Sequence, residues 1–219
     1  MRLAVHRLHL AGLHVPGQHR EWPVHGFVVT YDDRAMLVDT GVGGPDSLLS
    51  DWRVVNHSVA DALKELSMTP GDIELVVNTH LHFDHCGQNA LFPHAPVFVQ
   101  RAEVERAKRE ETELWDWFGF ANARFELLDG DAAIAPGVRV IATPGHTAGH
   151  QSVVVGGADL LIGDAAYTSW FYADPELPSD KIVPGQAADE ESWRASLRRL
   201  HAEGPARVHF CHDTAIAHG

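Results

Sequence analysis

The amino-acid sequence predicts an αββα sandwich, in which two mixed β-sheets pack face to face and helices cover their outer sides. Short apolar strands bracket a small number of helices, and the two halves of the 219-residue chain have a similar make-up. Several strands follow one another at hairpin spacing, which argues against the alternative of a doubly wound parallel sheet. No linker or low-complexity segment interrupts the pattern, so we expect a single domain over residues 1–219.

The first half of the chain supplies one group of strands and two helices. Apolar and β-branched runs predict strands over 3–10, 24–31, 35–39, 73–77 and 96–100. The Asp32-Asp33-Arg34 segment predicts a hairpin turn between the second and third of these strands. Residues 58–67 predict an amphipathic helix with Ser58 as its N-cap. A second helix is expected from Arg101 to about Glu113.

The second half repeats this style. Strands are expected over 124–131, 138–146, 150–157, 159–164 and 206–213. A helix is expected over 189–203, because Trp193, Leu197 and Leu200 recur on one helical face and should point inward. Together with the first half, these strands are enough for two sheets.

Composition and charge exclude several classes of protein. Apolar residues make up 45% and charged residues 21%, which is ordinary for a globular protein. The formal charge of −13, with histidine neutral, would repel nucleic acid and anionic membranes. The N-terminal segment has no uninterrupted apolar run of the kind found in signal peptides, and no stretch approaches the roughly 20 apolar residues of a membrane span. We therefore expect a soluble, cytoplasmic protein.

Only two cysteines occur, Cys86 and Cys211, which excludes a disulfide framework. Each adjoins a candidate metal ligand, so the two could lie close in space. Two reduced thiols are expected, with a bridge as the alternative.

A dense cluster of metal-binding residue types follows the strand 73–77. The segment THLHFDH, residues 79–85, contains His80, His82, Asp84 and His85, in a chain with the unusual number of 16 histidines. His80 and His82 are two residues apart and point the same way on extended backbone. Asp84 and His85 follow beyond a turn, where a helix should begin. His80 and His82 could therefore bind one ion, and Asp84 and His85 a neighbouring ion. Imidazole and carboxylate ligands suit zinc, with iron, manganese or cobalt as competitors.

Three more candidate ligands follow later strands. His146 lies in TPGHTAGH, Asp164 in LLIGD and His212 in HFCHD, each at the end of a predicted strand. All of these side chains should gather on one edge of the sandwich. Five histidines and two aspartates are enough ligands for two ions.

The segment THLHFDH resembles the HxHxDH signature of the metallo-β-lactamase superfamily. The elements TPGHTAGH, GD and HD match the remaining motifs of that superfamily in order and spacing, and LVDTG (37–41) extends the resemblance over nearly the whole chain. The resemblance implies two divalent ions that share a bridging hydroxide. It assigns His80, His82 and His146 to the first ion, Asp84, His85 and His212 to the second, and Asp164 to both. It also implies that Asp39 supports the site without binding metal. We expect the same of His150, with a solvent-exposed or core-satisfied histidine as the alternative.

Within the superfamily, the chain is most similar to the N-acyl homoserine lactonases. Tyr167 follows the bridging aspartate at the lactonase offset, and the segments 95–107 and 127–152 are similar to lactonase segments with no metal role. This resemblance implies hydrolysis of a lactone by the bridging hydroxide. The Tyr167 phenol would stabilise the carbonyl oxygen, and Asp84 would carry a proton to the leaving alkoxide. The exposed-looking aromatics Phe83, Trp117 and Trp170 are candidates for contacting the acyl chain.

Other functions would use the same metal site. A glyoxalase II-like thioesterase or another ester hydrolase is the main alternative, and a phosphodiesterase is disfavoured because the chain lacks a basic patch. A β-lactamase is weaker still, and the complete ligand set argues against a non-catalytic metal-binding module. In the lactonases, the region matching HVPGQHREWP (14–23) helps to form the pocket and a dimer contact. The resemblance therefore leaves a homodimer as an alternative to a monomer.

Overall fold

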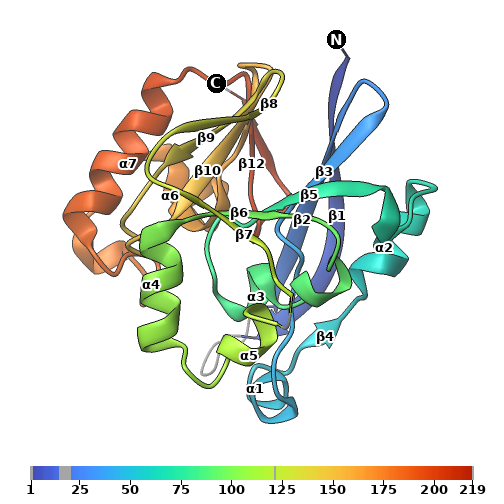
Figure 1. The fold of residues 1–219 in the computed structure, drawn as a ribbon. Helices are drawn as coiled ribbons and strands as arrows, with labels where there is room; N and C mark the ends of the chain where they lie inside the picture. Colours follow the sequence, from blue (N-terminus) through green and yellow to red (C-terminus); the bar gives the residue numbers. More distant parts are fainter. Residues whose placement is uncertain (1, 15–20, 121, 219) are drawn as a thin grey trace.

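Two β-sheets stacked against each other form the centre of the computed structural model, which describes residues 2–14, 21–120 and 122–218 (Figure 1). Within these residues the first sheet has seven strands, in the order β4 (Val55–Asn56), β1 (Leu3–His14), β2 (Glu21–Tyr31), β3 (Arg34–Val38), β5 (Ile73–Val77), β6 (Val97–Gln100) and β7 (Phe125–Leu128). The second has six, in the order β13 (Ile216–His218), β12 (Arg207–His209), β11 (Asp159–Leu161), β10 (Gln151–Val155), β9 (Val138–Ala142) and β8 (Ala132–Ala135). Both sheets mix parallel and antiparallel pairs, so the predicted sandwich is confirmed.

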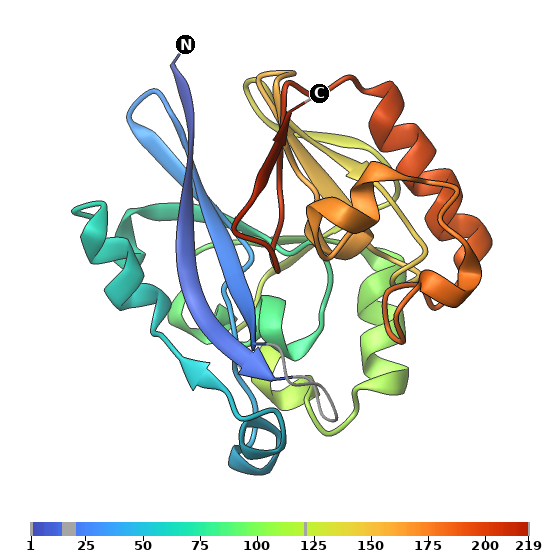
Figure 2. The ribbon, with the colours of Figure 1, turned by 180° about the vertical axis from the view of Figure 1, so that it is seen from behind.

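Helices cover the outer sides of both sheets. The described helices are α1 (Asp46–Asp51), α2 (Val59–Glu65), α3 (Phe83–Cys86), α4 (Arg101–Glu110), α5 (Trp115–Phe118), α6 (Ser169–Ala173) and α7 (Glu190–Ala202), with single-turn 3₁₀ helices η1 (Pro70–Asp72), η2 (Asn89–Leu91), η3 (Gly163–Ala165) and η4 (Ser179–Lys181). Helix α2 lies outside the first sheet and α7 outside the second, as the front and back views show (Figures 1 and 2). The Ser58 hydroxyl caps α2 as predicted, by accepting a hydrogen bond from the Ala60 amide. No helix in the described part of the chain is long and apolar enough to span a membrane.

The alternation of side chains along β2 shows how the layers are held together. Phe27 and Val29 point between the sheets, where they pack in one cluster with Val140 and Val153 of the second sheet. Val28 points to the opposite face and packs with the cluster that contains the buried residues of α2. Both faces at the centre of this sheet are therefore buried, which explains why β3 and β5 are almost continuously apolar.

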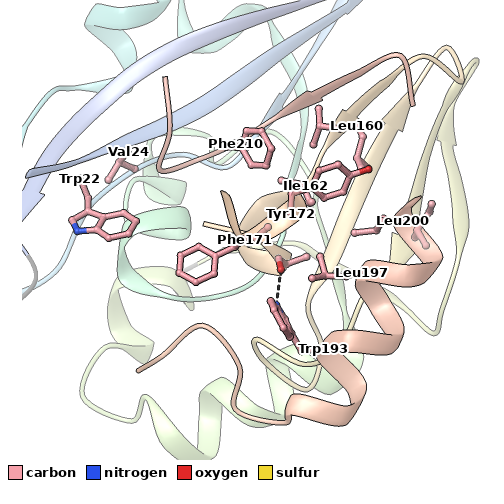
Figure 3. Packing of buried hydrophobic residues seen from close by; sticks show 14 of the residues in the cluster. Trp22, Val24, Leu160, Ile162, Phe171, Tyr172, Trp193, Leu197, Leu200 and Phe210 are labelled. Atoms are coloured by element: carbon pink, nitrogen blue, oxygen red, sulfur yellow. Dashed lines mark hydrogen bonds between the residues drawn. The ribbon is translucent and has the colours of Figure 1, made fainter. Parts of the chain in front are cut away.

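Helix α7 is fixed to the second sheet by its predicted apolar face. Trp193, Leu197 and Leu200 are fully buried against side chains from β11 and the segments that follow β11 and β12 (Figure 3). The Trp193 indole also donates a hydrogen bond of 2.7 Å to the carbonyl oxygen of Ala165. This contact connects the helix directly to the segment that carries Asp164.

Strand direction brings the candidate ligands together. Strands β3, β5 and β6 are parallel in the first sheet. In the second sheet β10 is antiparallel to both β9 and β11, while β11 is parallel to β12, so β9, β11 and β12 run in one direction. The segments after β3, β5, β9, β11 and β12 therefore emerge at one edge of the sandwich. Loops that a rigid scaffold holds in this way commonly carry binding and catalytic residues.

Several predicted boundaries and elements are wrong. The strand expected over 138–146 ends at Ala142 and that over 206–213 at His209, because the backbone leaves the sheet to form the ligand loops. Strand β1 runs on to His14 past an irregularity between His9 and Ala11. Other elements were not predicted at all. Strand β8 was missed because it is alanine-rich, and β13 and the helices α1, α5 and α6 were missed because they are three to six residues long, too short for a clear periodic signal.

Both cysteines are buried free thiols, as expected. Burial raises the pKa of the Cys211 thiol to about 12 and that of Cys86 well above its usual range. Neither thiol is therefore ionised near neutral pH.

Replacement of Trp193 tests the connection between α7 and the site segment. Trp193→Ala should lower the free energy of unfolding by about 3–5 kcal/mol, because it opens a large cavity in the core. Trp193→Phe should cost about 1–2 kcal/mol, since it keeps most of the packing and loses the bond to Ala165. Urea unfolding of the two variants measures both costs, and a Trp193→Phe variant as stable as the wild type would contradict this account of the indole hydrogen bond.

Candidate metal centre

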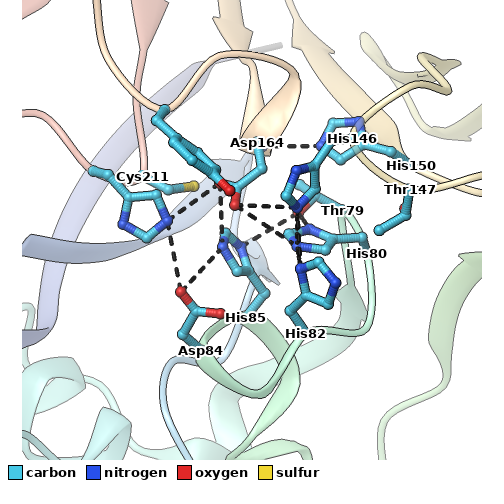
Figure 4. A network of polar contacts seen from close by, with 12 residues as sticks. Thr79, His80, His82, Asp84, His85, His146, Thr147, His150, Asp164 and Cys211 are labelled. Atoms are coloured by element: carbon cyan, nitrogen blue, oxygen red, sulfur yellow. Dashed lines mark hydrogen bonds and ion pairs between the residues drawn. The ribbon is translucent and has the colours of Figure 1, made fainter. Parts of the chain in front are cut away.

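All seven predicted ligands come together at one edge of the sandwich, at the ends of strands from both sheets (Figure 4). The residues after β5 and in α3 supply four of them. His146 follows β9, Asp164 lies in η3 just after β11, and His212 follows β12. The predicted start of a helix at Asp84 and His85 is confirmed by α3, whose amides bond back to the carbonyl of His82.

Three histidines form the first group. The Nε2 atom of His80 lies 2.9 Å from Nδ1 of His82 and 3.1 Å from Nε2 of His146. His82 Nδ1 and His146 Nε2 are 3.0 Å apart. The other ring nitrogens of His80 and His146 face the Thr79 hydroxyl and the Gln186 carbonyl. Since a neutral imidazole carries one N–H, a donation from His146 Nδ1 to that carbonyl leaves its Nε2 lone pair facing the group.

Burial keeps this first group uncharged. It lowers the pKa values of His80 and His82 well below the usual range and also lowers that of His146, and the neighbouring imidazoles reinforce the effect for His80 and His82. Neutral imidazole is the form that binds a metal ion. Three converging lone pairs are therefore available at neutral pH.

Asp84, His85 and His212 form the second group. The Oδ2 atom of Asp84 lies 3.8 Å from Nε2 of His85 and 3.6 Å from Nε2 of His212. Burial acts to lower the pKa values of both histidines, but the negative charges of Asp164 and Asp84 outweigh it and raise both values. In the absence of a bound cation, the raised pKa values therefore favour the protonated form of both rings.

Asp164 lies between the two groups. Its Oδ1 is 3.2 Å from His85 Nε2 and 3.3 Å from His212 Nε2, while its Oδ2 is 3.4 Å from His146 Nε2. Burial acts to raise the pKa of this carboxyl, but His85 and His212 hold the pKa well below its usual range. One carboxylate can thus contact a cation in either group.

Two buried atoms support a metal fit. His85 Nε2 and Asp164 Oδ1 make no hydrogen bond of acceptable geometry to the described residues, although both are shielded from solvent. Such orphaned polar atoms are rare and costly in a folded protein. A divalent cation bound to both would satisfy them, and the surrounding nitrogen and oxygen atoms match the ligand types of zinc.

Asp39 and His150 are placed beside the ligands. Asp39 accepts hydrogen bonds of 2.8 Å from the amide and hydroxyl of Thr79, and its Oδ2 is 2.8 Å from His85 Nδ1, so His85 presents Nε2 to the site. Ring nitrogen Nε2 of His150 accepts from the amide of Asp164. Asp39, His85 and Cys211 also place ligand atoms close together, but both oxygens of the Asp39 carboxylate already accept hydrogen bonds from these donors.

Glycines allow the loops around the site to touch backbone to backbone. A side chain on Gly87 would place Cβ 1.8 Å from the Gly43 nitrogen, and Gly43 donates to the Phe83 carbonyl. The glycines after LVDT therefore let the segment carrying Asp39 pack directly on α3.

A pocket of about 360 Å³ opens onto the metal-ligand groups. Its described lining includes Leu13, Trp22, Leu48, Trp52, His82, Phe83, Asp84, Glu111, Leu114, Asp164, Tyr167, Val183 and His212. The ring of Tyr167 lies between the two groups, with its centroid 5.5 Å from that of His146 and 5.4 Å from that of His212. The pocket thus joins an apolar wall to the candidate metal ligands.

The aromatic residues expected in the pocket are only partly there. Phe83 lines it and packs edge-on against Trp52. Trp117 and Trp170 are absent from the described lining and are 43% and 53% exposed, because the short helices α5 and α6 turn them to the surface. Trp22 also lines the pocket and was not named individually, although it lies in the segment 14–23 whose counterpart in the lactonases was expected to help form the pocket.

Comparison with known proteins identifies the class. A family model described as the metallo-beta-lactamase superfamily matches residues 19–212, and the chain belongs to that superfamily. It is 32% identical over 221 residues to an N-acyl homoserine lactonase of Bacillus sp., with 90% of this chain and 84% of the relative covered. It is 31% identical to the N-acyl homoserine lactonase AttM of Rhizobium radiobacter, with 93% and 83% covered.

A solved structure extends the comparison. An N-acyl homoserine lactone hydrolase with the product N-hexanoyl-L-homoserine at its catalytic metal centre superposes with a TM-score of 0.76 at 27% identity, covering 97% of this chain and 93% of the other. The resemblance to the lactonase branch that the sequence indicated is therefore confirmed.

Zinc binding should release protons near neutral pH, because the raised pKa values of His85 and His212 favour their protonated forms in the metal-free protein and ligation requires the neutral rings. The affinity for zinc should accordingly rise with pH. Calorimetric titration in two buffers of different ionisation enthalpy measures the release, with His212→Ala as a variant that should release fewer protons. A binding enthalpy independent of the buffer would contradict this.

Proposed function

We propose that this metal-dependent hydrolase opens the lactone ring of N-acyl homoserine lactones. The observation that carries the proposal is the single pocket in which an apolar wall meets Tyr167, Asp84 and Asp164. The named activities of the relatives support the same substrate class. The ester end of such a substrate would lie at the acidic and histidine side chains, and the acyl chain would lie along the wall.

The chemistry of the pocket favours a neutral ester over a phosphodiester. Its described lining is aromatic and aliphatic on one side, with Trp22, Trp52 and Phe83 as the largest surfaces. Burial of each acyl methylene on such a wall contributes about 0.8 kcal/mol. No lysine or arginine side chain is among the described lining residues, whereas phosphates and the carboxylates of a glutathione thioester both call for basic partners. The thioesterase alternative is therefore less well supported.

We assign His80, His82 and His146 to one divalent ion and Asp84, His85 and His212 to a second, with Asp164 contacting both. The two groups described above and the position of Asp164 support this assignment. Zinc matches the nitrogen and oxygen ligands, and iron, cobalt and manganese can use the same set. When bound, the two ions would supply Lewis acidity and activate a water molecule as the nucleophile.

Tyr167 is suited to stabilise the carbonyl oxygen of the lactone. Burial raises the pKa of its phenol well above the usual range, and the nearby Asp164 and Asp84 charges add to the effect. The phenol therefore stays protonated and can donate a hydrogen bond as negative charge develops on that oxygen. Pre-positioned donors of this kind are among the largest contributors to acyl-transfer catalysis.

Asp84 is suited to transfer a proton from the nucleophile to the leaving group. Its carboxylate lines the pocket and lies next to His212 and His85. In the proposed reaction, the oxygen of water adds to the carbonyl carbon and the ring C–O bond breaks. Asp84 accepts the proton lost by the nucleophile and returns it to the leaving alkoxide. The product is an N-acyl homoserine with one new hydroxyl and one new carboxylate, and the second proton of the water is released to solvent.

Acid release from N-octanoyl homoserine lactone tests the proposal directly. Zinc-loaded protein should open the lactone and leave a p-nitrophenyl phosphodiester intact, and metal-free protein should do neither. Hydrolysis of the phosphodiester without lactone opening would replace the proposed substrate class. Inactivity toward both, with the metals bound, would direct the search to thioesters.

Tyr167→Phe should lower kcat for the lactone by about 100-fold, the cost expected for one lost oxyanion donor. Its metal content should stay unchanged, because the phenol is not one of the assigned ligands. Asp164→Asn serves as the contrasting variant and should lose metal and activity together. A Tyr167→Phe enzyme as fast as the wild type would refute the assigned role of the phenol.

A further inference from the structure

Glu103 is a buried carboxylate for which the proposed reaction has no use. It lies in the first turn of α4 and is 0% exposed, which is rare for a glutamate. It sits between the loop that carries His80 and His82 and the loop that carries His146. The Glu103 carboxylate therefore lies where it can bond to both loops.

The carboxylate bonds to both loops. Its Oε1 accepts from the Leu81 amide at 2.9 Å and from two nitrogens of Arg106 at 3.0 and 2.8 Å. Its Oε2 accepts from the Thr147 hydroxyl at 2.7 Å and from the Gly149 amide at 3.2 Å. One oxygen thus holds the first loop and the other holds the second.

These partners are the immediate neighbours of the histidines. Leu81 stands between His80 and His82, and Thr147 directly follows His146. A side chain on Gly149 would place Cβ 2.1 Å from the Glu103 nitrogen, so the second loop packs on α4 with no space between them. The three-nitrogen group exists only where the two loops meet, and Glu103 is bonded to each loop within one residue of a histidine.

Only a carboxylate satisfies this position. All five hydrogen bonds to Glu103 come from donors, and an ionised carboxylate is an acceptor at both oxygens. A glutamine of the same volume offers one acceptor and one donor, so it cannot accept from both the Leu81 amide of the first loop and the Gly149 amide of the second. Arg106, itself buried, compensates the charge.

We propose that Glu103 is a positioning residue that sets the placement of His80 and His82 relative to His146, and thereby the metal affinity of that group alone. Asp39 has the corresponding contact in the second group, where it bonds to His85. Asp39 touches the first group only indirectly, through the Thr79 hydroxyl beside His80, and the hydrogen bonds of Glu103 reach no residue of the second group. This inference rests on the two-ion assignment made for the proposed function.

Metal content of Glu103→Gln tests the inference. The wild type should retain two zinc ions per chain during dialysis against a weak chelator, and the variant should retain one, with the lost ion bound about 10–100-fold more weakly. Asp159→Asn is the matched control, because Asp159 is also a buried carboxylate paired with an arginine, Arg207, at the other end of β11. It should retain both ions.

Cobalt-loaded protein shows which ion is lost. Proton NMR should resolve paramagnetically shifted exchangeable ring N–H signals, three from the first group and two from the second. Glu103→Gln should lose the three and keep the two. Retention of both ions with wild-type affinity, or equal loss of both, would overturn the positioning role. A wild type that binds no metal would overturn the proposed function as well.

If Glu103→Gln fails to fold, Thr147→Val and Thr147→Ser decide the question. The valine removes one bond to Glu103 with little change in volume, and the serine keeps the hydroxyl. Thr147→Val should weaken the binding of one ion, and Thr147→Ser should restore it. Identical behaviour of the two variants would overturn the inference.

Discussion

The close approach of five imidazole rings and two carboxylates in a buried space is the constraint on which the rest of the structure depends. Nitrogen atoms 2.9–3.1 Å apart in the first group cannot all be satisfied by hydrogen bonds to one another. In a low dielectric this arrangement is costly unless a cation occupies it and the surrounding backbone holds the rings in place. The carboxylates of Asp39 and Glu103 provide that hold from the two sides of the ligand loop.

The sandwich supplies the positions. Strands from both sheets end at one edge, so ligands far apart in the sequence meet there without long loops. The continuous core between the sheets fixes those strand ends, and the Trp193 contact fixes the segment of Asp164. Rigidity at the metal ligands is combined with a pocket wall built from other segments, which can differ between relatives of the same fold.

The sequence predicted which polar side chains gather at the site better than it predicted the pocket, for a physical reason. Metal ligation demands fixed residue types at fixed offsets from strand ends, so the candidate ligands His80, His82 and His146 could be picked out from spacing. Pocket walls depend on how short helices are turned, and the sequence does not specify that, so Trp117 and Trp170 were wrongly placed. Glu103 gave no signal, because a glutamate on a charged helix is usually exposed and its role depends on two loops distant in sequence.

Anomalous scattering at the zinc absorption edge, from crystals grown with zinc, tests the central claim most directly. The account predicts two peaks. One should lie within bonding distance of the ring nitrogens of His80, His82 and His146, and the other beside Asp84, His85 and His212, with the Asp164 carboxylate touching both. A single peak, or a peak on Asp39, His85 and Cys211 in place of the second group, would contradict it.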